Sequence, residues 1–343
     1  NMLFNHNSVT LLPEMSGNHL GSLDNALEFV HQIHQQGAKW LKLQCFEPEQ
    51  IAVPLRSEEF LIKNSAWSGN YLIDLYKKSY TPKAWLYELI SLSNKLDISV
   101  VLSVFSTHDL EWALTQDIKA LKIASPESID YQLIQLALDS SMPLIISTGM
   151  QSVDELMFLR DLLNSHINKD SYLMLCTSSY PAEPSDLKLQ HVYKFQSFSN
   201  NPIGFSDHSI GQWASISAIA LGCSFIEKHF RLDHDSESVD HHFSMPISQL
   251  NDFKKNLDFT FSSVSSVQDL GPSQSELESL KYRPSLYFCN SLPKGHVIQP
   301  EDLICLRPSL GLHPRFFPEI IGSMLLHDVQ TYQPVTVESY SSS

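Results

Sequence analysis

Eight short apolar segments recur through the first two thirds of the chain, and most gaps between them have an amphipathic helical pattern. That pattern is clear in Leu23–Gln36, Lys83–Leu96 and Val153–Ser165. Strands that alternate with helices predict right-handed βαβ units and a parallel sheet. Eight such units predict a closed (β/α)₈ TIM barrel. The predicted strands are Thr10–Ser16, Trp40–Phe46, Val100–Phe105, Ala120–Ser125, Pro143–Gly149, Tyr172–Ser178, Ile203–His208 and Phe225–Phe230.

Most of these segments begin with apolar residues and finish with polar ones. Examples are Glu14, Lys42, Lys122, Asp207 and His229. The carboxyl ends of barrel strands converge on one mouth, where the active sites of such barrels lie. A simpler explanation is that polar residues mark the edge of the core, but that explains Ser better than repeated Lys, Glu and His. The sequence therefore predicts a functional site at the barrel mouth.

Three further segments complete the expected organisation. Residues 46–80 are too many for an ordinary βα loop and include Trp67 and Tyr76, so we expect a lid or a substrate-facing insertion. A Ser-rich stretch containing Gly271 and Pro272 predicts a linker. The expected domains are a barrel at 3–261, a linker at 262–281 and a small β-rich domain at 282–343.

Composition narrows the classes of function. A formal net charge of −15 argues against nucleic acid and anionic membranes as partners. The five cysteines form no CxxC pair, and no apolar run reaches transmembrane length, so we expect reduced thiols and a cytoplasmic protein. Neither a Walker A motif nor GxGxxG occurs, so nothing indicates a nucleotide cofactor.

Two histidines are the best candidates for metal ligands. His208 and His229 stand at the ends of the last two predicted strands, which are neighbours in a barrel. Two neutral imidazoles leave coordination positions for water and a substrate oxygen, which suits a Lewis-acidic divalent ion. The polar residues that follow, from Asp233 to His242, are interpreted mainly as a solvated loop.

Two lysines lie within apolar strands, where an unpaired ammonium is costly. Lys42 and Lys122 therefore either extend to water or meet an anion. With the hydroxyls of Ser103, Ser125 and Ser147 at the same mouth, they predict a cradle for phosphate and carboxylate.

One carboxylate on the first strand has two open interpretations. Glu14 is a candidate acid or base at the mouth. It is equally a candidate partner for a neighbouring lysine. Sequence spacing does not decide between these two roles.

Several ordered motifs resemble the sialic acid synthase family, and within it the pseudaminic acid synthase branch. The resemblance covers nearly the whole chain. The neuraminic branch typically has Asn where Ser178 stands. The motifs are PEMSGNH at 13–19, KLQ at 42–44, KIAS at 122–125, IISTGM at 145–150, CTSSYPAEP at 176–184, GFSDHS at 204–209, IEKHF at 226–230 and SLYF at 285–288.

The resemblance implies a barrel followed by an antifreeze-like (SAF, β-clip) domain. It also implies a domain-swapped homodimer and a divalent metal ion, with Mn²⁺ expected first and Mg²⁺ or Co²⁺ as alternatives. The implied reaction joins phosphoenolpyruvate to an open-chain 2-acetamido sugar, most specifically a 2,4-diacetamido-trideoxy hexose. The product would be a nonulosonic acid, with pseudaminic acid expected first, and phosphate would leave by C–O cleavage.

The resemblance also implies roles for individual residues. His208 and His229 would bind the metal, and Glu14 would act on the attacking water. Lys42, Ser103 and Lys122 would face the carboxylate of phosphoenolpyruvate. Lys122 would also hold the phosphate, together with Ser125, Ser147, Ser178 and Ser206. Gln44, Glu127, Tyr180 and Asp240 would contact the sugar or order the site, and Arg307 of the partner subunit would reach the sugar.

Departures from the family pattern leave the choice of sugar open. Leu20 replaces the usual Asn, Ser309 replaces the usual Gly, and residues 239–246 read VDHHFSMP. We expect Leu20 and the segment around Asp240 to lie near the sugar. The alternatives are a legionaminic or N-acetylneuraminic acid synthase, a barrel that binds a sugar or phosphate without turnover, and a metal-dependent class II aldolase.

Overall fold

The computed structural model describes residues 2–63, 67–166, 169–265 and 270–341. Residues 64–66 of the expected insertion, 266–269 of the expected linker and 342–343 of the expected C-terminal domain lie outside the described residues. The chain divides into two compact units, Asn1–Ser266 and Val267–Ser343. Each unit is described by itself.

The first unit is the predicted parallel barrel. Each strand pairs with the next, and β1 also pairs in parallel with β8, which closes the sheet. A two-residue strand, β9, continues the pairing beyond β8. The predicted closed barrel of eight parallel strands is therefore confirmed. The strands are β1 (Thr10–Glu14), β2 (Trp40–Cys45), β3 (Ser99–Val104), β4 (Ala120–Ile123), β5 (Leu144–Ser147), β6 (Ser171–Cys176), β7 (Gly204–Asp207), β8 (Phe225–Arg231) and β9 (Met245–Pro246).

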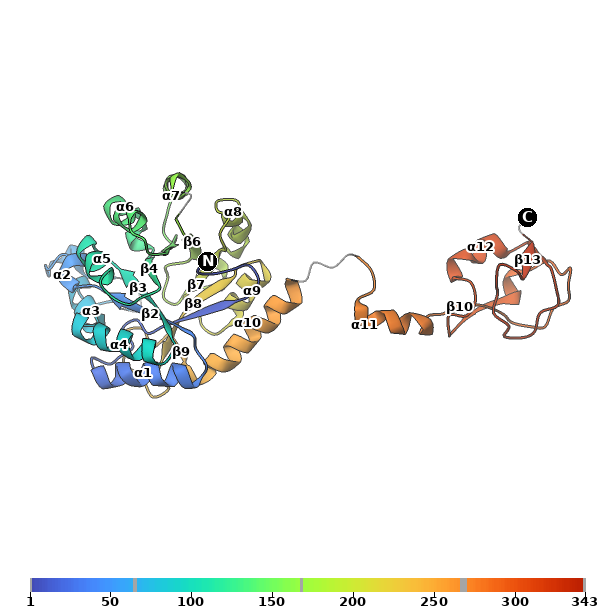
Figure 1. Ribbon diagram of the computed structural model, residues 1–343, viewed down its shortest axis with the longest axis horizontal. Coiled ribbons are helices and arrows are strands. Elements are labelled where there is room, and N and C mark those ends of the chain that lie inside the picture. The colour runs from blue at the N-terminus through green and yellow to red at the C-terminus, as the bar shows by residue number, and fades with distance from the viewer. Residues whose placement is uncertain (1, 64–66, 167–168, 266–269, 342–343) are drawn as a thin grey trace. The chain divides into compact units, whose positions relative to one another are not determined.

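Helices surround these strands (Figure 1). Those predicted from sequence periodicity occur within one residue of the expected bounds. Within the described parts of the chain, none is long and apolar enough to cross a membrane. The helices of this unit are α1 (Leu23–Gln35), α2 (Pro48–Ile51), α3 (Leu72–Ser79), α4 (Lys83–Lys95), α5 (Thr107–Ala113), α6 (Tyr131–Asp139), α7 (Val153–Ser165), α8 (Val192–Gln196), α9 (Trp213–Ala220) and α10 (Leu250–Val264).

The barrel interior changes from apolar to polar along each strand. Alternate residues of a strand face the same side, so residues two apart share the interior. Near the amino ends of the strands, Leu12, Val101 and Phe225 form an apolar cluster with Phe4, whose ring stacks on Phe225 at 4.2 Å between centroids. Two residues further along β1, the interior position is Glu14. This pattern places the polar side chains together at the carboxyl ends.

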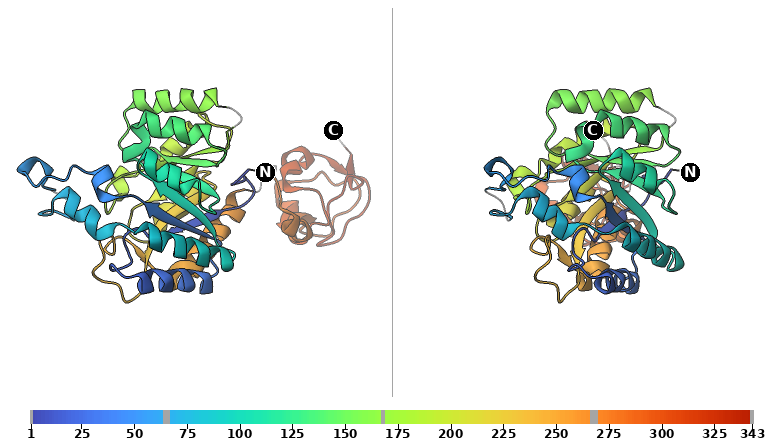
Figure 2. Two further views of the ribbon diagram at one scale, coloured as in Figure 1. Left: turned by 60° about the vertical axis from the view of Figure 1, so that its left-hand side comes forward. Right: turned by 90° about the vertical axis from the view of Figure 1, so that its left-hand side faces the viewer.

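A larger apolar core lies between the strands and the surrounding helices. It includes Phe29 and Ile33 of α1, Leu86 of α4 and Leu257 of α10, all fully or almost fully buried. Figure 2 shows helices on several sides of the strands in two further views. The helices thus support the strands from outside, and the carboxyl ends are left for the site.

The second unit is small and rich in short strands. Antiparallel pairs β10–β11 and β12–β13 surround an apolar core that includes Leu286, Phe288 and Ile298. Helix α10 ends at Val264, three residues beyond the expected barrel boundary, and α11 lies within the expected linker. The elements are α11 (Gln274–Leu277), β10 (Ser285–Phe288), β11 (Leu303–Leu306), α12 (Phe317–Ile320), β12 (Met324–Leu325) and β13 (Tyr340–Ser341).

Candidate functional site

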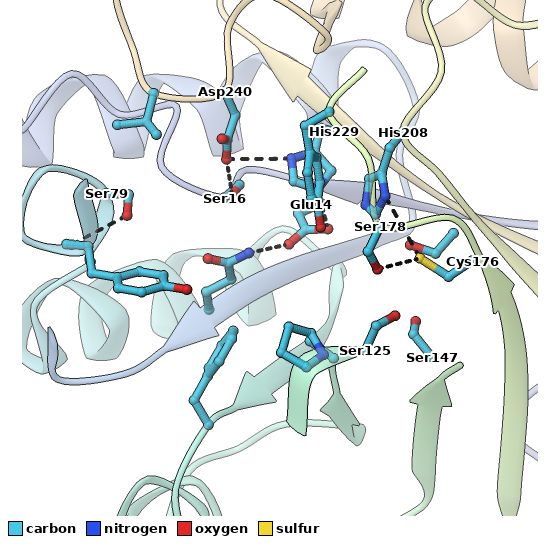
Figure 3. A pocket seen from close by; sticks show the side chains of 18 of the residues that line it. Glu14, Ser16, Ser79, Ser125, Ser147, Cys176, Ser178, His208, His229 and Asp240 are labelled. Carbon is cyan, nitrogen blue, oxygen red and sulfur yellow. Dashed lines mark hydrogen bonds and ion pairs between the residues drawn. The ribbon is translucent and has the colours of Figure 1, made fainter. Parts of the chain in front are cut away.

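A cavity of about 620 Å³ opens at the carboxyl ends of the strands (Figure 3). All but three of the site residues predicted from the sequence line it, which brings together side chains from many strands. The lining residues among those predicted are Glu14, Lys42, Gln44, Lys122, Ser125, Ser147, Ser178, Tyr180, Ser206, His208, His229 and Asp240.

The three exceptions lie in different places. Ser103 is fully buried on β3, directly across from Lys122 in the strand register. Glu127 is half-buried in the turn after β4, next to Pro126, which does line the cavity. Arg307 is exposed at the end of β11 in the second unit. Its predicted contact with a partner's sugar stays a prediction.

Four charged side chains form the floor of the cavity, and all are almost completely buried. The strand register sets Glu14 across from Lys42 on one side and from His229 on the other. Lys42 Nζ lies 2.7 Å from Glu14 Oε1 and 3.3 Å from Glu227 Oε1. Lys122 Nζ donates to both oxygens of Glu227, at 3.0 and 2.8 Å. The two ammoniums and two carboxylates therefore make one connected cluster.

These contacts change the pKa of each member. Burial would raise the pKa of Glu14, but His229 and Lys42 more than offset this and the pKa is lowered. Burial would also raise the pKa of Glu227, but Lys122 and Lys42 outweigh it and lower the pKa. Burial would lower the pKa of Lys42, but the two carboxylates outweigh it and raise the pKa. For Lys122, burial prevails and the pKa is lowered from its usual value. The same cluster therefore shifts the pKa values of Lys42 and Lys122 in opposite directions.

The lysines predicted as an anion cradle thus already have anionic partners. The sequence left two roles open for Glu14. The geometry shows it paired with Lys42, and a role as acid or base stays a prediction. Other donors lie close by, because Gln44 Nε2 donates to Glu14 at 2.8 Å and Ser206 Oγ donates to Glu227 at 2.8 Å. The buried hydroxyl of Ser147 has no protein partner among the described residues and is free to meet a ligand.

Two imidazoles stand beside this cluster. The ring centroids of His208 and His229 are 5.3 Å apart. His208 Nδ1 lies 3.1 Å from the carbonyl oxygen of Thr177, which accepts but cannot donate, so Nδ1 carries the proton in the neutral ring. His208 Nε2 is then left with its lone pair. His229 Nε2 lies 3.1 Å from Glu14 Oε2, and His229 Nδ1 lies 3.7 Å from Asp240 Oδ2.

This arrangement fits a two-histidine metal site. A backbone carbonyl that fixes the tautomer of a histidine is a frequent outer contact of metal ligands. Within the described ranges, no three His, Cys, Asp or Glu side chains are grouped so that they could hold an ion together. A metal held here would therefore rest on the two imidazoles and on oxygen ligands from water or substrate.

The wall of the cavity contributed by the 46–80 insertion is largely apolar. Ile62, Trp67, Leu75 and Tyr76 line it, together with Phe46 at the start of the insertion. Trp67 Nε1 donates to the carbonyl of Val239 at 2.9 Å, and its ring lies 5.3 Å from that of Tyr180. The cavity therefore has a charged floor and an apolar wall.

The segment after β8 is not the solvated loop expected for most of it. His234 is exposed, but Asp235 is almost fully buried and accepts hydrogen bonds from the backbone of Glu237 and Ser238. Asp240 is also buried and accepts from Ser16 Oγ at 2.5 Å. Hydrogen-bond partners inside the fold offset the cost of burying these carboxylates, which sequence composition does not reveal.

Leu20, expected near the sugar, does not line the cavity, and its position relative to the sugar stays a prediction. Leu20 is 38% exposed and lies in the loop between β1 and α1. Its backbone has a positive φ of 54°, so the turn itself sets its direction. The structure gives no explanation for Leu at this position in place of Asn.

Glu227 and Cys176 are among the residues of the site that sequence reasoning missed. Glu227 bridges both lysines. Cys176 Sγ lies 3.8 Å from His208 Nδ1 and 3.7 Å from Ser178 Oγ. Burial would raise the pKa of Cys176, but His208 and neighbouring hydrogen bonds lower it to about 7. The two-residue period of the strands could have found both, because Glu227 precedes His229 by two positions and Cys176 precedes Ser178 by two.

The acidity of Glu127 gives a first testable prediction. Burial raises its pKa to about 7, so the folded protein binds a proton that the unfolded chain releases above about pH 4.5. Stability contributed by this group therefore falls as pH rises from about 4.5 to about 7. We expect Glu127→Gln to leave the unfolding free energy nearly unchanged at pH 5 and to raise it by on the order of 2 kcal/mol at pH 8.

Urea unfolding of both proteins at the two pH values measures this difference. Glu88→Gln, on an exposed position of α4, is the matched control and should show no such pH dependence. An equal effect of Glu127→Gln at both pH values would contradict the prediction.

Comparison with known proteins agrees with the fold and the motifs. The NeuB family model matches residues 29–268, and the SAF domain model matches residues 283–338. The chain is 32% identical over 324 residues to a pseudaminic acid synthase of Campylobacter jejuni, covering 94% of each chain. It is 30% identical over 323 residues to an N,N'-diacetyllegionaminic acid synthase of Legionella pneumophila, covering 92% of this chain and 90% of that one.

A solved structure gives the same result. The N-acetylneuraminic acid synthetase of Leptospira borgpetersenii, in complex with citrate, superposes with a TM-score of 0.72 at 25% identity, covering 80% of this chain and 91% of that one. The resemblance to sialic acid synthases stated from the motifs is thus confirmed. The chain belongs to the NeuB family and carries a C-terminal SAF domain.

Proposed function

We propose that this protein condenses phosphoenolpyruvate with an open-chain acetamido sugar to form a nonulosonic acid, most specifically pseudaminic acid. The observation that carries the proposal is the joint placement of Lys42, Lys122 and several hydroxyls directly beside His208 and His229 in one cavity. The names of the relatives, pseudaminic and legionaminic acid synthases, support the same reaction class.

In this proposal the protein groups divide the work. Lys42 and Lys122 hold the anionic groups of phosphoenolpyruvate, and the hydroxyls of Ser125, Ser147 and Ser178 complete the cradle. Glu14 lies within reach of the histidine side of the cavity, where it would hold and orient the water that adds to the substrate.

A divalent ion, with Mn²⁺ as the first choice, is the cofactor that the two histidines fit. When bound, it would supply Lewis-acid polarisation of a carbonyl oxygen. His208 through Nε2 and His229 would hold it, and Tyr180, whose ring lies 4.4 Å from that of His208, would close one side.

The apolar wall favours a sugar with few hydroxyls at the end remote from the aldehyde. A 2,4-diacetamido-trideoxy hexose carries a methyl group at C6 and an acetamido methyl at C4, which can pack on Ile62, Trp67 and Leu75. An N-acetylhexosamine would place hydroxyls there. This favours a pseudaminic or legionaminic precursor over the N-acetylneuraminic one.

Phosphate release tests the function. Purified protein is incubated with phosphoenolpyruvate, Mn²⁺ and each of three sugars: the altro and manno 2,4-diacetamido-trideoxy hexoses and N-acetylmannosamine. We expect release that depends on the sugar and is fastest with the altro isomer. Fastest release with the manno isomer would support the legionaminic alternative. No release with any sugar would support a barrel that binds without turnover.

We also propose a domain-swapped homodimer in which Arg307 reaches the cavity of the partner. The family resemblance and the exposure of Arg307 support this. Two inactive variants, His208→Ala and Arg307→Ala, should then complement one another when their subunits are mixed and exchanged. Equal mixing gives about one intact site in four for a two-fold dimer, so about a quarter of wild-type activity should return. Activity that stays at the level of the separate variants would contradict a shared site.

A further inference from the structure

We propose that Asp207 and Lys228, a buried ion pair on the helix-facing side of the barrel strands, position the two histidines of the site. This inference rests on the proposed metal-binding role of His208 and His229. Asp207 and Lys228 each precede one of these histidines in sequence and are paired across β7 and β8 in the strand register. Because side chains alternate along a strand, the pair faces the helices while the histidines face the cavity.

Asp207 holds the turn that directly follows His208. Its Oδ1 accepts from the backbone nitrogen of Ser209 at 2.8 Å and from Ser209 Oγ at 2.6 Å. Its Oδ2 accepts from Ser215 Oγ of α9 at 2.5 Å and lies 3.0 Å from Lys228 Nζ. One carboxylate therefore ties the end of β7, the turn after His208 and a helix together.

Lys228 completes the link to the second histidine. Its Nζ also donates to the carbonyl oxygen of Ser209 at 2.8 Å, so it holds the same turn from β8. The position after Lys228 is His229. The separation of the two imidazoles is thus set by contacts that lie behind them, on the far side of the strand backbone.

Burying two charges costs solvation free energy, which indicates that this ion pair has a role beyond packing. Asp207 and Lys228 are each 1% exposed, so both charges are removed from water. A buried ion pair often stabilises a fold no better than apolar residues of similar size. What apolar residues cannot supply is the directional hold on Ser209. Outer groups that orient metal ligands commonly change metal affinity 10- to 100-fold when mutated. Here the hold acts on the backbone next to His208 and not on an imidazole nitrogen.

Mn²⁺ binding by the full-length protein, without substrates, tests the inference. The variant Asp207→Asn with Lys228→Met removes both charges together, so that neither is left buried alone. We expect its Mn²⁺ dissociation constant, measured by the loss of the free-ion paramagnetic resonance signal, to rise about 10- to 100-fold. The midpoint of thermal unfolding should change by only a few degrees.

A matched control has the same substitutions at another ion pair on the helix side of the barrel. Asp109, fully buried at the start of α5, lies 3.1 Å from Lys83 Nζ, and Asp109→Asn with Lys83→Met should leave Mn²⁺ affinity unchanged. If the Asp207 and Lys228 variant does not fold, Ser215→Ala removes one contact of Asp207 and should raise the dissociation constant about two- to tenfold.

The outcomes separate this inference from the proposed metal role. Failure of the wild-type protein to bind Mn²⁺ would overturn the metal role and this inference with it. If the wild-type protein binds Mn²⁺ and the folded double variant binds it with unchanged affinity, the positioning role alone is overturned. If the double variant does not fold, unchanged affinity in Ser215→Ala overturns the positioning role in the same way. Equal losses of Mn²⁺ affinity in the Asp207 and Lys228 variant and in the Asp109 and Lys83 control would also overturn the positioning role.

Discussion

Replacing His208 by alanine is expected to lower kcat/KM by at least about a thousandfold while the protein stays folded. A bound metal contributes several kcal/mol to stabilising charge in the transition state, and about 4 kcal/mol corresponds to a thousandfold. Among the described residues, no three His, Cys, Asp or Glu side chains are placed so that they could hold an ion together, so we expect no protein group to replace the lost ligand. Steady-state phosphate release with saturating Mn²⁺ measures the loss.

The control is His234→Ala, at an exposed position of the segment after β8. It should retain wild-type turnover and the same thermal midpoint as the parent. Substantial turnover by the His208 variant in metal-free buffer would contradict a role for this side chain in holding an ion.

Replacing Lys122 by methionine is expected to lower kcat/KM for phosphoenolpyruvate at least about tenfold. Charge-assisted contacts in a sheltered site contribute roughly 1.5–3 kcal/mol each, which corresponds to about a 10- to 100-fold change in an equilibrium constant. The protein carries a net charge of −15, so long-range attraction does not assist the capture of this anion. The KM for the sugar should change much less, because the sugar is neutral and, in the proposed reaction, lies toward the histidines.

The structure adds a cost in stability to this variant. Lys122 Nζ is the closest cation to Glu227, and Lys42 Nζ is farther away at 3.3 Å. Removing one partner of a buried pair typically destabilises a fold by about 3–5 kcal/mol. Lys83→Met, which removes the partner of buried Asp109, is the control for stability and should keep the parent KM for phosphoenolpyruvate. An unchanged phosphoenolpyruvate KM and kcat in Lys122→Met would remove this residue from the site.

The barrel was predictable because its signal repeats. Each strand gives an apolar segment, each following helix gives a 3.6-residue period, and the count of eight fixes closure. The residues at the barrel mouth were predictable for a related reason. All barrel strands run in the same direction, so Glu14, Lys42 and His229, near the carboxyl ends of their strands, are expected at the same end of the barrel. The register confirms this expectation by pairing Glu14 with both neighbours.

The pairing of charges was only partly predictable from the same signals. Lysines within strands indicated an anion, and Glu14 on the neighbouring strand was a candidate partner. Glu227, which pairs with both lysines, comes from β8, far from both of them in sequence. The buried state of Asp235 depends on backbone donors in its own turn, which no periodicity reports. The apolar wall depends on how the 46–80 insertion folds back over the mouth, and that is set by long-range contacts such as Trp67 with Val239.

The fate of one oxygen atom tests the central claim most directly. The substrate is phosphoenolpyruvate labelled with ¹⁸O at the oxygen that bridges carbon and phosphorus. It is turned over with the altro diacetamido sugar, and the ¹⁸O content of both products is measured by mass spectrometry. Condensation with C–O cleavage predicts that all of the label leaves in phosphate, in step with a nonulosonic acid whose C2 oxygen comes from water. Label retained in the organic product, or phosphate released without the sugar being consumed, would contradict the account.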